Sequence, residues 1–97
     1  MLATLALLAC ASDSPRPQPE LTAAWAAFLE LPPQRAMAIA GEFRRGPWVT
    51  ASSGGHATLA DAENEALTRC RVAREARRMR AACVIYAVGS EIVWRGR

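Results

Sequence analysis

The sequence contains a single histidine and no lysine among its 97 residues. Because His56 stands alone, metal sites built from several histidines are excluded, and a zinc site would need it together with Cys70, Cys83 and a further ligand at an unusual spacing. The serine, cysteine, histidine and acidic residues form no pattern that is typical of a catalytic site. We therefore expect no enzymatic activity, no metal and no cofactor.

Large apolar side chains are also scarce. Hydrophobic residues make up 52% of the chain, but alanine supplies much of that fraction and aromatic residues only 6%. A chain of this length buries about 60–65% of the surface that it exposes when unfolded, so we expect one domain of marginal stability. The large core candidates are Trp25, Phe28, Ile39, Phe43, Trp48, Leu67, Ile85, Tyr86 and Trp94.

The apolar stretch at residues 1–10 is much shorter than the roughly 20 residues that span a bilayer, and it has the character of a signal peptide. It ends in Leu-Leu-Ala-Cys at positions 7–10. This ending resembles the lipobox of bacterial lipoproteins, in which a small residue precedes the cysteine that becomes the acylated N-terminus. The resemblance implies lipidation of Cys10, with palmitate among the acyl chains. No basic residue precedes the stretch, and a plain cleaved signal peptide or an incidental apolar N-terminus is the alternative.

Residues 11–19 are rich in serine and proline and carry no large apolar side chain, which is typical of an extended tether. In an extended form these nine residues would hold a domain at most about 28 Å from a lipid anchor. The chain therefore divides into a signal peptide with a lipobox at 1–10, a tether at 11–19 and one small domain at 20–97.

Residues 20–31 are expected to form an amphipathic helix that ends before two consecutive prolines. Its large side chains, Leu21, Trp25, Phe28 and Leu29, recur at helical spacing. The opposite face is alanine and lacks the basic residues of a membrane-surface helix, so we expect core packing in preference to a membrane-surface or partner-binding role.

Two hairpins follow from the β-branched and aromatic runs and the turn residues between them. The first pairs residues 36–43 with 48–52, and the second pairs 83–88 with 91–94 across Gly89 and Ser90. Alternation would place Val84, Tyr86 and Val88 on one side of the third strand, and Ile85 and Ala87 on the other. The glycine-rich loop at 52–56 resembles no phosphate-binding motif, although such a loop before a helix can bind anions.

A long helix should begin after Thr58, whose hydroxyl can cap the N-terminus. Its apolar arc consists of Leu59, Ala62, Ala66, Cys70 and Ala73. A further helical turn would place the charge of Arg77 in the same arc, so the helix should end near that residue. Export places the domain in an oxidising compartment and the lipobox accounts for Cys10, so Cys70 and Cys83 should form a disulfide.

These elements predict an α+β fold with a small four-stranded antiparallel sheet in the order ββαββ. The long helix should cover one face of the sheet. The N-terminal helix is the candidate for the other face, because both faces of the third strand are apolar.

Six arginines fall within twelve positions of the long helix and its C-terminal end. They are Arg69, Arg71, Arg74, Arg77, Arg78 and Arg80. Arg71, Arg74 and Arg78 form a possible surface for phosphate, anionic lipid headgroups or acidic sugars. The alternative is a solvated face on which Glu65 pairs with Arg69, and Arg71 with Glu75. No aromatic side chain accompanies this face, so we expect no nucleic acid.

Three segments together resemble small exported domains of proteobacteria. They read Ala-Met-Ala-Ile-Ala at 36–40, Ala-Leu-Thr-Arg-Cys at 66–70, and Cys-Val-Ile-Tyr-Ala-Val-Gly at 83–89 before Ile-Val-Trp at 92–94. The resemblance implies a strand pair, an alanine-rich helix and a following strand. The function of these domains is uncharacterised, so the resemblance implies no particular activity for this chain. Met37, Phe43 and the arginine pair between the first two strands depart from the pattern.

The sequence thus predicts a lipoprotein of the cell envelope, anchored in the inner or outer membrane through Cys10, with its domain facing the periplasm. We expect a binding or structural module whose partner is an envelope protein or the cell wall. The alternatives are a small envelope enzyme, or a basic nucleic-acid-binding module if the N-terminus is not a signal.

Overall fold

The computed structural model describes residues 16–95. A 3₁₀ turn at Pro19–Leu21 leads into α1 (Thr22–Leu29). The rest of the domain consists of β1 (Ala36–Gly41), β2 (Trp48–Ser53), α2 (Leu59–Ala76), β3 (Val84–Val88) and β4 (Glu91–Ile92). The predicted signal peptide, Cys10 and residues 11–15 of the predicted tether lie outside the described residues.

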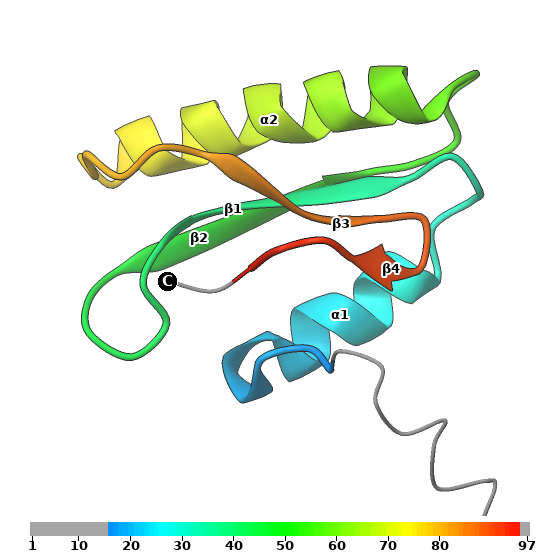
Figure 1. Cartoon of the computed structure of the whole chain (residues 1–97). Coiled ribbons are helices and arrows are strands. Elements are labelled where there is room, and N and C mark those ends of the chain that lie inside the picture. The colour runs from blue at the N-terminus through cyan, green and yellow to red at the C-terminus, as the bar shows by residue number, and fades with distance from the viewer. Residues whose placement is uncertain (1–15, 96–97) are drawn as a thin grey trace, which may run out of the picture.

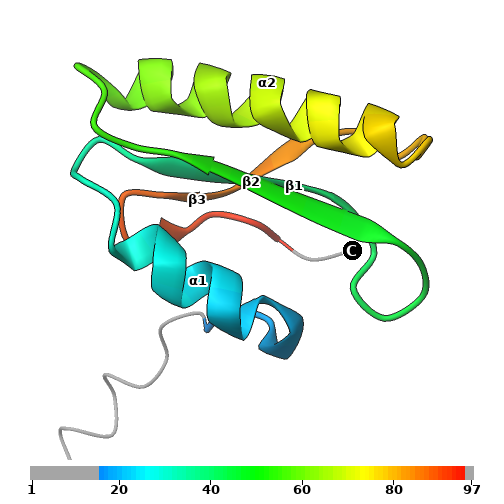
Figure 2. The same cartoon turned by 180° about the vertical axis from the view of Figure 1, so that it is seen from behind.

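The four strands form one antiparallel sheet in the order β2-β1-β3-β4. The long helix α2 lies across one face, and α1 lies against part of the other (Figures 1 and 2). The predicted α+β fold with a ββαββ sheet and an N-terminal helix is confirmed. Between residues 16 and 95, no helix is both long and apolar enough to cross a membrane.

Helix α2 begins as predicted, since the hydroxyl of Thr58 accepts a hydrogen bond from the backbone N–H of Asp61 at 3.1 Å. Ala62, Ala66 and Cys70 are buried against the sheet. Leu59, which the predicted arc includes, is 39% exposed because the first turn of the helix extends past the packed surface. The buried face of α2 is therefore narrower than the sequence predicts.

The central strand β1 supplies both cores, because successive side chains of a strand point to opposite faces. Its alanines, Ala36, Ala38 and Ala40, pack with the buried alanines of α2. Its larger residues, Met37 and Ile39, pack on the other face with a cluster that includes Leu21, Phe28 and Tyr86. Small side chains on one side let α2 approach closely, and the predicted packing of the N-terminal helix against the sheet is confirmed.

The predicted alternation along β3 is wrong beyond Tyr86. The register with β1 shifts, so that Met37 pairs with Ala87 while Ala38 pairs with Ile85. Tyr86 is the extra residue of a bulge, and Tyr86 and Ala87 both belong to the α1-side cluster. The same bulge shortens β4, since the N–H groups of Val93 and Trp94 both donate to the Tyr86 carbonyl, at 2.9 and 3.1 Å.

The predicted disulfide between Cys70 and Cys83 is present, with 6.1 Å between the two Cα atoms. It joins Cys70, about two thirds of the way along α2, to the residue before β3. The return of the chain is possible because α2 ends at Ala76, with Arg77 as its C-cap.

Candidate functional site

The loop between β1 and β2 and the loop after α2 lie at the same end of the domain (Figures 1 and 2). A pocket of about 490 Å³ opens between these loops. Its arginines are Arg45, Arg77, Arg78 and Arg80, and we call this feature the arginine pocket. Arginines from segments more than 30 residues apart thus line one pocket. The Nη1 of one of them, Arg77, is bonded to the Trp48 carbonyl.

The positive charge of the arginine pocket is not neutralised by contact with acidic groups. Glu42 is the one carboxylate among its lining residues. Between residues 16 and 95, the single ion pair within 4.0 Å is Glu65 with Arg69, which lies elsewhere on α2. Because guanidinium remains protonated at all physiological pH values, the pocket presents a permanent positive potential.

Arg78 is held in an unusual backbone conformation, with φ of 58°. The N–H of Arg78 donates to the carbonyl of Glu75, and the N–H of Met79 to that of Arg74. This is the Schellman arrangement, in which the residue at the position of Arg78 is usually glycine because side chains disfavour left-handed backbone. Arg78 thus combines a backbone conformation that is unfavourable for a side chain with a place in the lining of the arginine pocket.

The disulfide fixes the loop that carries most of the pocket. Arg77, Arg78 and Arg80 all lie within the segment closed by Cys70 and Cys83, whose sequence separation is 13. The Nη1 of Arg74 donates to the Ala81 carbonyl at 3.1 Å and, at 3.5 Å, to that of Arg80. The covalent link and these hydrogen bonds position the pocket before any ligand arrives, which reduces the entropy lost on binding.

The structure separates the three arginines that the sequence suggests as an anion-binding surface. Arg78 lines the arginine pocket. The guanidinium of Arg74 is bonded to the loop carbonyls, and Arg71 is exposed on α2 and does not line the pocket. The predicted ion pair between Glu65 and Arg69 is present at 3.0 Å, whereas Arg71 and Glu75 form no ion pair.

Sequence reasoning missed Arg45, because nothing local indicates that a hairpin loop will fold against the end of a distant helix. It also grouped arginines by helical spacing, and this spacing does not apply to Arg80, which follows the end of α2. The two adjacent arginines in the first hairpin loop were the available signal. Their position in a turn between apolar strands places them at an end of the sheet.

Arg69 of α2 and Arg77 at its C-cap cover the outer edge of β2. The Nη1 of Arg69 donates to the carbonyl of Ser52 at 2.9 Å, and the Nη1 of Arg77 to that of Trp48 at 3.1 Å. Eight residues of helix rise about 12 Å and four residues of strand about 13 Å, so the spacing of the two arginines matches that of the two carbonyls. Charged side chains that cover an edge prevent it from pairing with other chains.

A pairing of Ser53 and His56 is the one arrangement that suggests catalysis. The Ser53 hydroxyl and the His56 Nε2 are hydrogen-bonded. Ser53 is only 2% exposed, and no carboxylate of residues 16–95 is hydrogen-bonded to the imidazole ring. A buried hydroxyl cannot meet a substrate, so we assign this pair to the structure of the loop before α2. No cluster of three metal-binding side chains occurs in the described part of the chain.

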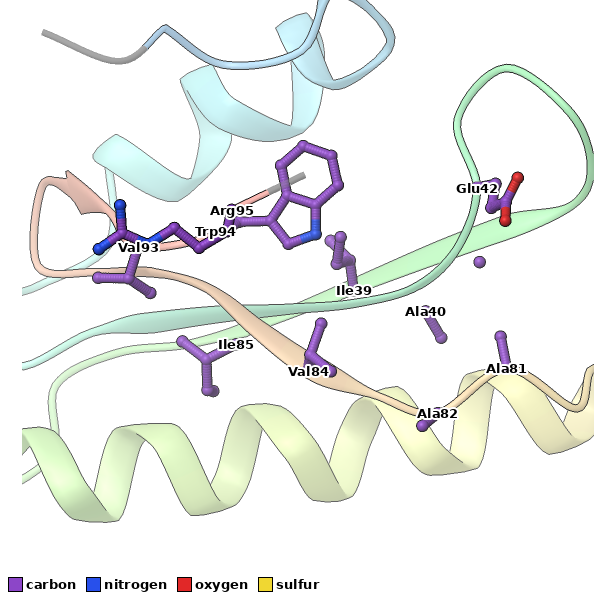
Figure 3. Close-up of a pocket in the computed structure, with 11 residues that line it drawn as sticks. Ile39, Ala40, Glu42, Ala81, Ala82, Val84, Ile85, Val93, Trp94 and Arg95 are labelled. Carbon is purple, nitrogen blue, oxygen red and sulfur yellow. The ribbon is translucent and has the colours of Figure 1, made fainter. Parts of the chain in front are cut away.

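A second hollow, of about 450 Å³, lies beside β3 and is shown in Figure 3. We call it the β3 groove. Trp94 and Val93 line one side and Val84 and Ala81 the other, with Ile39 on its floor. Val84 and Val93 are 44% and 40% exposed. The groove therefore exposes apolar side chains to solvent next to the arginine pocket, and the charged residues Glu42 and Arg95 also line it.

Searches of protein-family models, of curated proteins and of solved structures found no match for this chain.

Proposed function

We propose that this protein is a lipid-anchored binding module of the bacterial cell envelope, and that the arginine pocket binds an anionic envelope component. The observation that carries the binding role is the pocket itself. Its four arginines are arranged by two separate loops, and a single carboxylate shares the space. Guanidinium is the side-chain group best suited to recognise carboxylate or phosphate through paired hydrogen bonds.

The envelope location is supported by the Leu-Leu-Ala-Cys ending at positions 7–10 and by the serine and proline residues that follow. The Cys70–Cys83 disulfide is consistent with it, because disulfides persist in oxidising compartments and are rare in the cytosol. Acylation of Cys10 would keep the domain close to the membrane surface. A short tether raises the local concentration of any partner held in the same membrane.

The anchor is tested by expressing the full chain and the Cys10→Ser variant in cells grown with labelled palmitate. The unaltered chain should incorporate label and enter the detergent phase, and the variant should do neither. Equal partitioning of both forms would contradict the anchor. Recovery of the unaltered chain in the cytosolic fraction would favour a nucleic-acid-binding role.

The pocket is tested with a multivalent anion such as pyrophosphate, followed by calorimetry at low salt. Arg45→Ala and Arg80→Ala should each weaken binding, while Arg71→Ala, outside the pocket, should leave it unchanged. Because the interaction is electrostatic, affinity should fall as salt is raised. An affinity that is insensitive to Arg45→Ala and Arg80→Ala would overturn the assignment of the pocket.

A further inference from the structure

The two edges of the sheet differ in how their outward backbone groups are covered. At the β2 edge, Arg69 and Arg77 occupy the outward carbonyls of Ser52 and Trp48. At the other edge, β4 is only two residues long and pairs with Ala87 and Val88. The first half of β3 therefore has no neighbouring strand on its outer side.

The backbone groups at this open edge can be identified by alternation. Ser52 and Trp48 direct their carbonyls away from β1, and their partners in β1 are Met37 and Gly41. Residues of β1 at odd positions therefore direct their hydrogen-bonding groups toward β3, and those at even positions toward β2. Ile85 pairs with the even residue Ala38, so its N–H and C=O point outward.

The chain that could have covered these groups turns away. After Val93 and Trp94 bond to the carbonyl of Tyr86, the segment diverges from β3, as Figures 1 and 2 show. No backbone hydrogen bond outside the β1 pairing reaches Ile85 from residues 16–95. The β3 groove lies in the space that this divergence leaves.

The β3 groove is continuous with the arginine pocket. Gly41, Glu42 and Ala81 line both hollows. Gly41 has φ of 100°, and a side chain there would collide with the Pro47 carbonyl oxygen. Any side chain at position 41 would thus disturb the turn between β1 and β2, so this position favours glycine.

We propose that an extended acidic peptide segment of a partner protein adds as a strand to the β3 edge and places its carboxylates in the arginine pocket. This inference rests on the proposed anion-binding role of that pocket. Main-chain hydrogen bonds to Ile85 would provide register, and an apolar side chain would enter the groove beside Val84 and Trp94. The positive pocket selects a negative partner by charge complementarity.

The spacing of the partner's residues follows from the number of residues between Ile85 and the arginine pocket. From Ile85 to Ala81, where the pocket begins, four residues of extended chain span roughly 13 Å. An acidic residue should therefore lie three to five positions from the residue that pairs with Ile85. Residues between them should alternate, with every second side chain directed toward the groove.

A lipid acyl chain could also lie against the apolar side chains of the groove, but it would leave the backbone groups at the β3 edge without hydrogen-bonding partners. The outward N–H and C=O of Ile85 need hydrogen-bonding partners, and a hydrocarbon chain that covers them would remove water without replacing its hydrogen bonds. A peptide backbone supplies both a donor and an acceptor at the required spacing. The open edge therefore favours a peptide over a lipid.

The test uses the purified full chain and a probe peptide with fluorescein on its N-terminal amine, fluorescein-Val-Thr-Val-Thr-Val-Glu-Glu-amide, in a fluorescence anisotropy titration. Two further probes carry N-methyl groups on alternate amides, one on the odd set and the other on the even set. Only one of these sets faces the β3 edge, so one methylated probe should lose about tenfold or more in affinity and the other should bind like the parent. This comparison requires no change in the protein.

Variants of the protein provide the second arm. Val84→Asp places a negative charge in the groove. It should lower the affinity for the parent probe at least about fivefold, because the charge repels the carboxylates of the probe. Val72→Asp is the matched control, because Val72 is 66% exposed on α2 and does not line the groove. This variant should bind the probe with unchanged affinity. Circular dichroism establishes that both variants are folded.

The outcomes separate this inference from the proposed function. Equal affinity for both methylated probes would overturn strand addition, while a remaining dependence on Arg80 would leave the pocket intact. Binding of phosphatidylglycerol vesicles that Val84→Asp abolishes, without binding of the probe, would overturn the peptide in favour of a lipid surface. If Arg45→Ala and Arg80→Ala changed neither the affinity for the probe nor that for pyrophosphate, both proposals would be overturned.

Discussion

The backbone N–H of Gln18 donates a hydrogen bond to the phenol oxygen of Tyr86 at 3.0 Å, across 68 positions of sequence. Tyr86 is fully buried on the α1 side of the sheet and contacts Trp25, Phe43 and Trp94 edge-on or tilted. The bond attaches the chain before α1 to the centre of the aromatic cluster. The fixed structure therefore begins at least two residues before the predicted domain start at Glu20.

Burial raises the pKa of Tyr86 above its ordinary value of 10.0, and the Gln18 N–H opposes this by lowering it. A raised pKa means that the neutral phenol is favoured in the folded state. Its contribution to stability is complete below pH 10 and is lost as pH rises through the raised value. Urea denaturation from pH 8 to 11 should show this loss, and Tyr86→Phe should reduce it. No lysine and no other tyrosine titrates in this range. An equal loss in Tyr86→Phe would contradict the assignment.

The disulfide should supply a large part of the stability of this small domain. Closing a loop of this length stabilises by about 3 kcal/mol on the chain-entropy account. Cys70→Ala and Cys83→Ala should each lower the free energy of unfolding by about that amount, and the double variant no further, because both changes remove one bond. Thiol labelling of urea-denatured periplasmic protein, without reductant, provides the check. Labelling of both cysteines would show that the bond is absent.

Arg78→Gly should separate stability from binding. Glycine adopts positive φ without the steric penalty of a side chain, so the variant should be more stable by about 0.5–1 kcal/mol. It should also bind pyrophosphate more weakly, because one guanidinium leaves the arginine pocket. Thermal unfolding and calorimetry on the same samples measure the two effects. A loss of stability would contradict the account of the Schellman turn.

Removing both arginine side chains that cover the β2 edge should promote self-association. Arg69→Ala combined with Arg77→Ala frees the carbonyls of Ser52 and Trp48 for pairing with another chain. Light scattering at increasing protein concentration should reveal dimers or larger species in the double variant. Arg71→Ala, which removes one positive charge from an exposed position of α2, is compared with each single variant, Arg69→Ala and Arg77→Ala, as the control. A double variant that stays monomeric would argue against a guarding role.

Substitution of the partly exposed Arg35 should lower the free energy of unfolding strongly. Its Nε donates to the Gly89 carbonyl, its Nη1 to the carbonyls of Leu29 and Leu31, and its Nη2 to the Ser90 hydroxyl, all within 2.8–2.9 Å. Arg35→Ala should cost about 2–3 kcal/mol, and Arg35→Lys most of that, because an ammonium cannot reproduce the planar fork. Chemical denaturation measures both. Full rescue by lysine would show that charge alone suffices.

Local sequence patterns determined the secondary structure of this protein well. Periodicity located the long helix, the hydroxyl of Thr58 marked its start, and turn residues located both hairpins. These signals depend on residues a few positions apart, and short-range sterics and burial act on the same scale. The pairing of Cys70 with Cys83 also followed, since only two cysteines remain for the domain.

The tertiary structure alone decided which arginines act together and where the sheet is open. Arg45 and Arg80 line the same pocket because two loops fold to the same end of the domain. Arg74 does not line it, and its guanidinium is bonded to the loop carbonyls. The bulge at Tyr86 turns the last residues away from β3. Register and loop packing arise from contacts between distant segments, and no local pattern of residues encodes them.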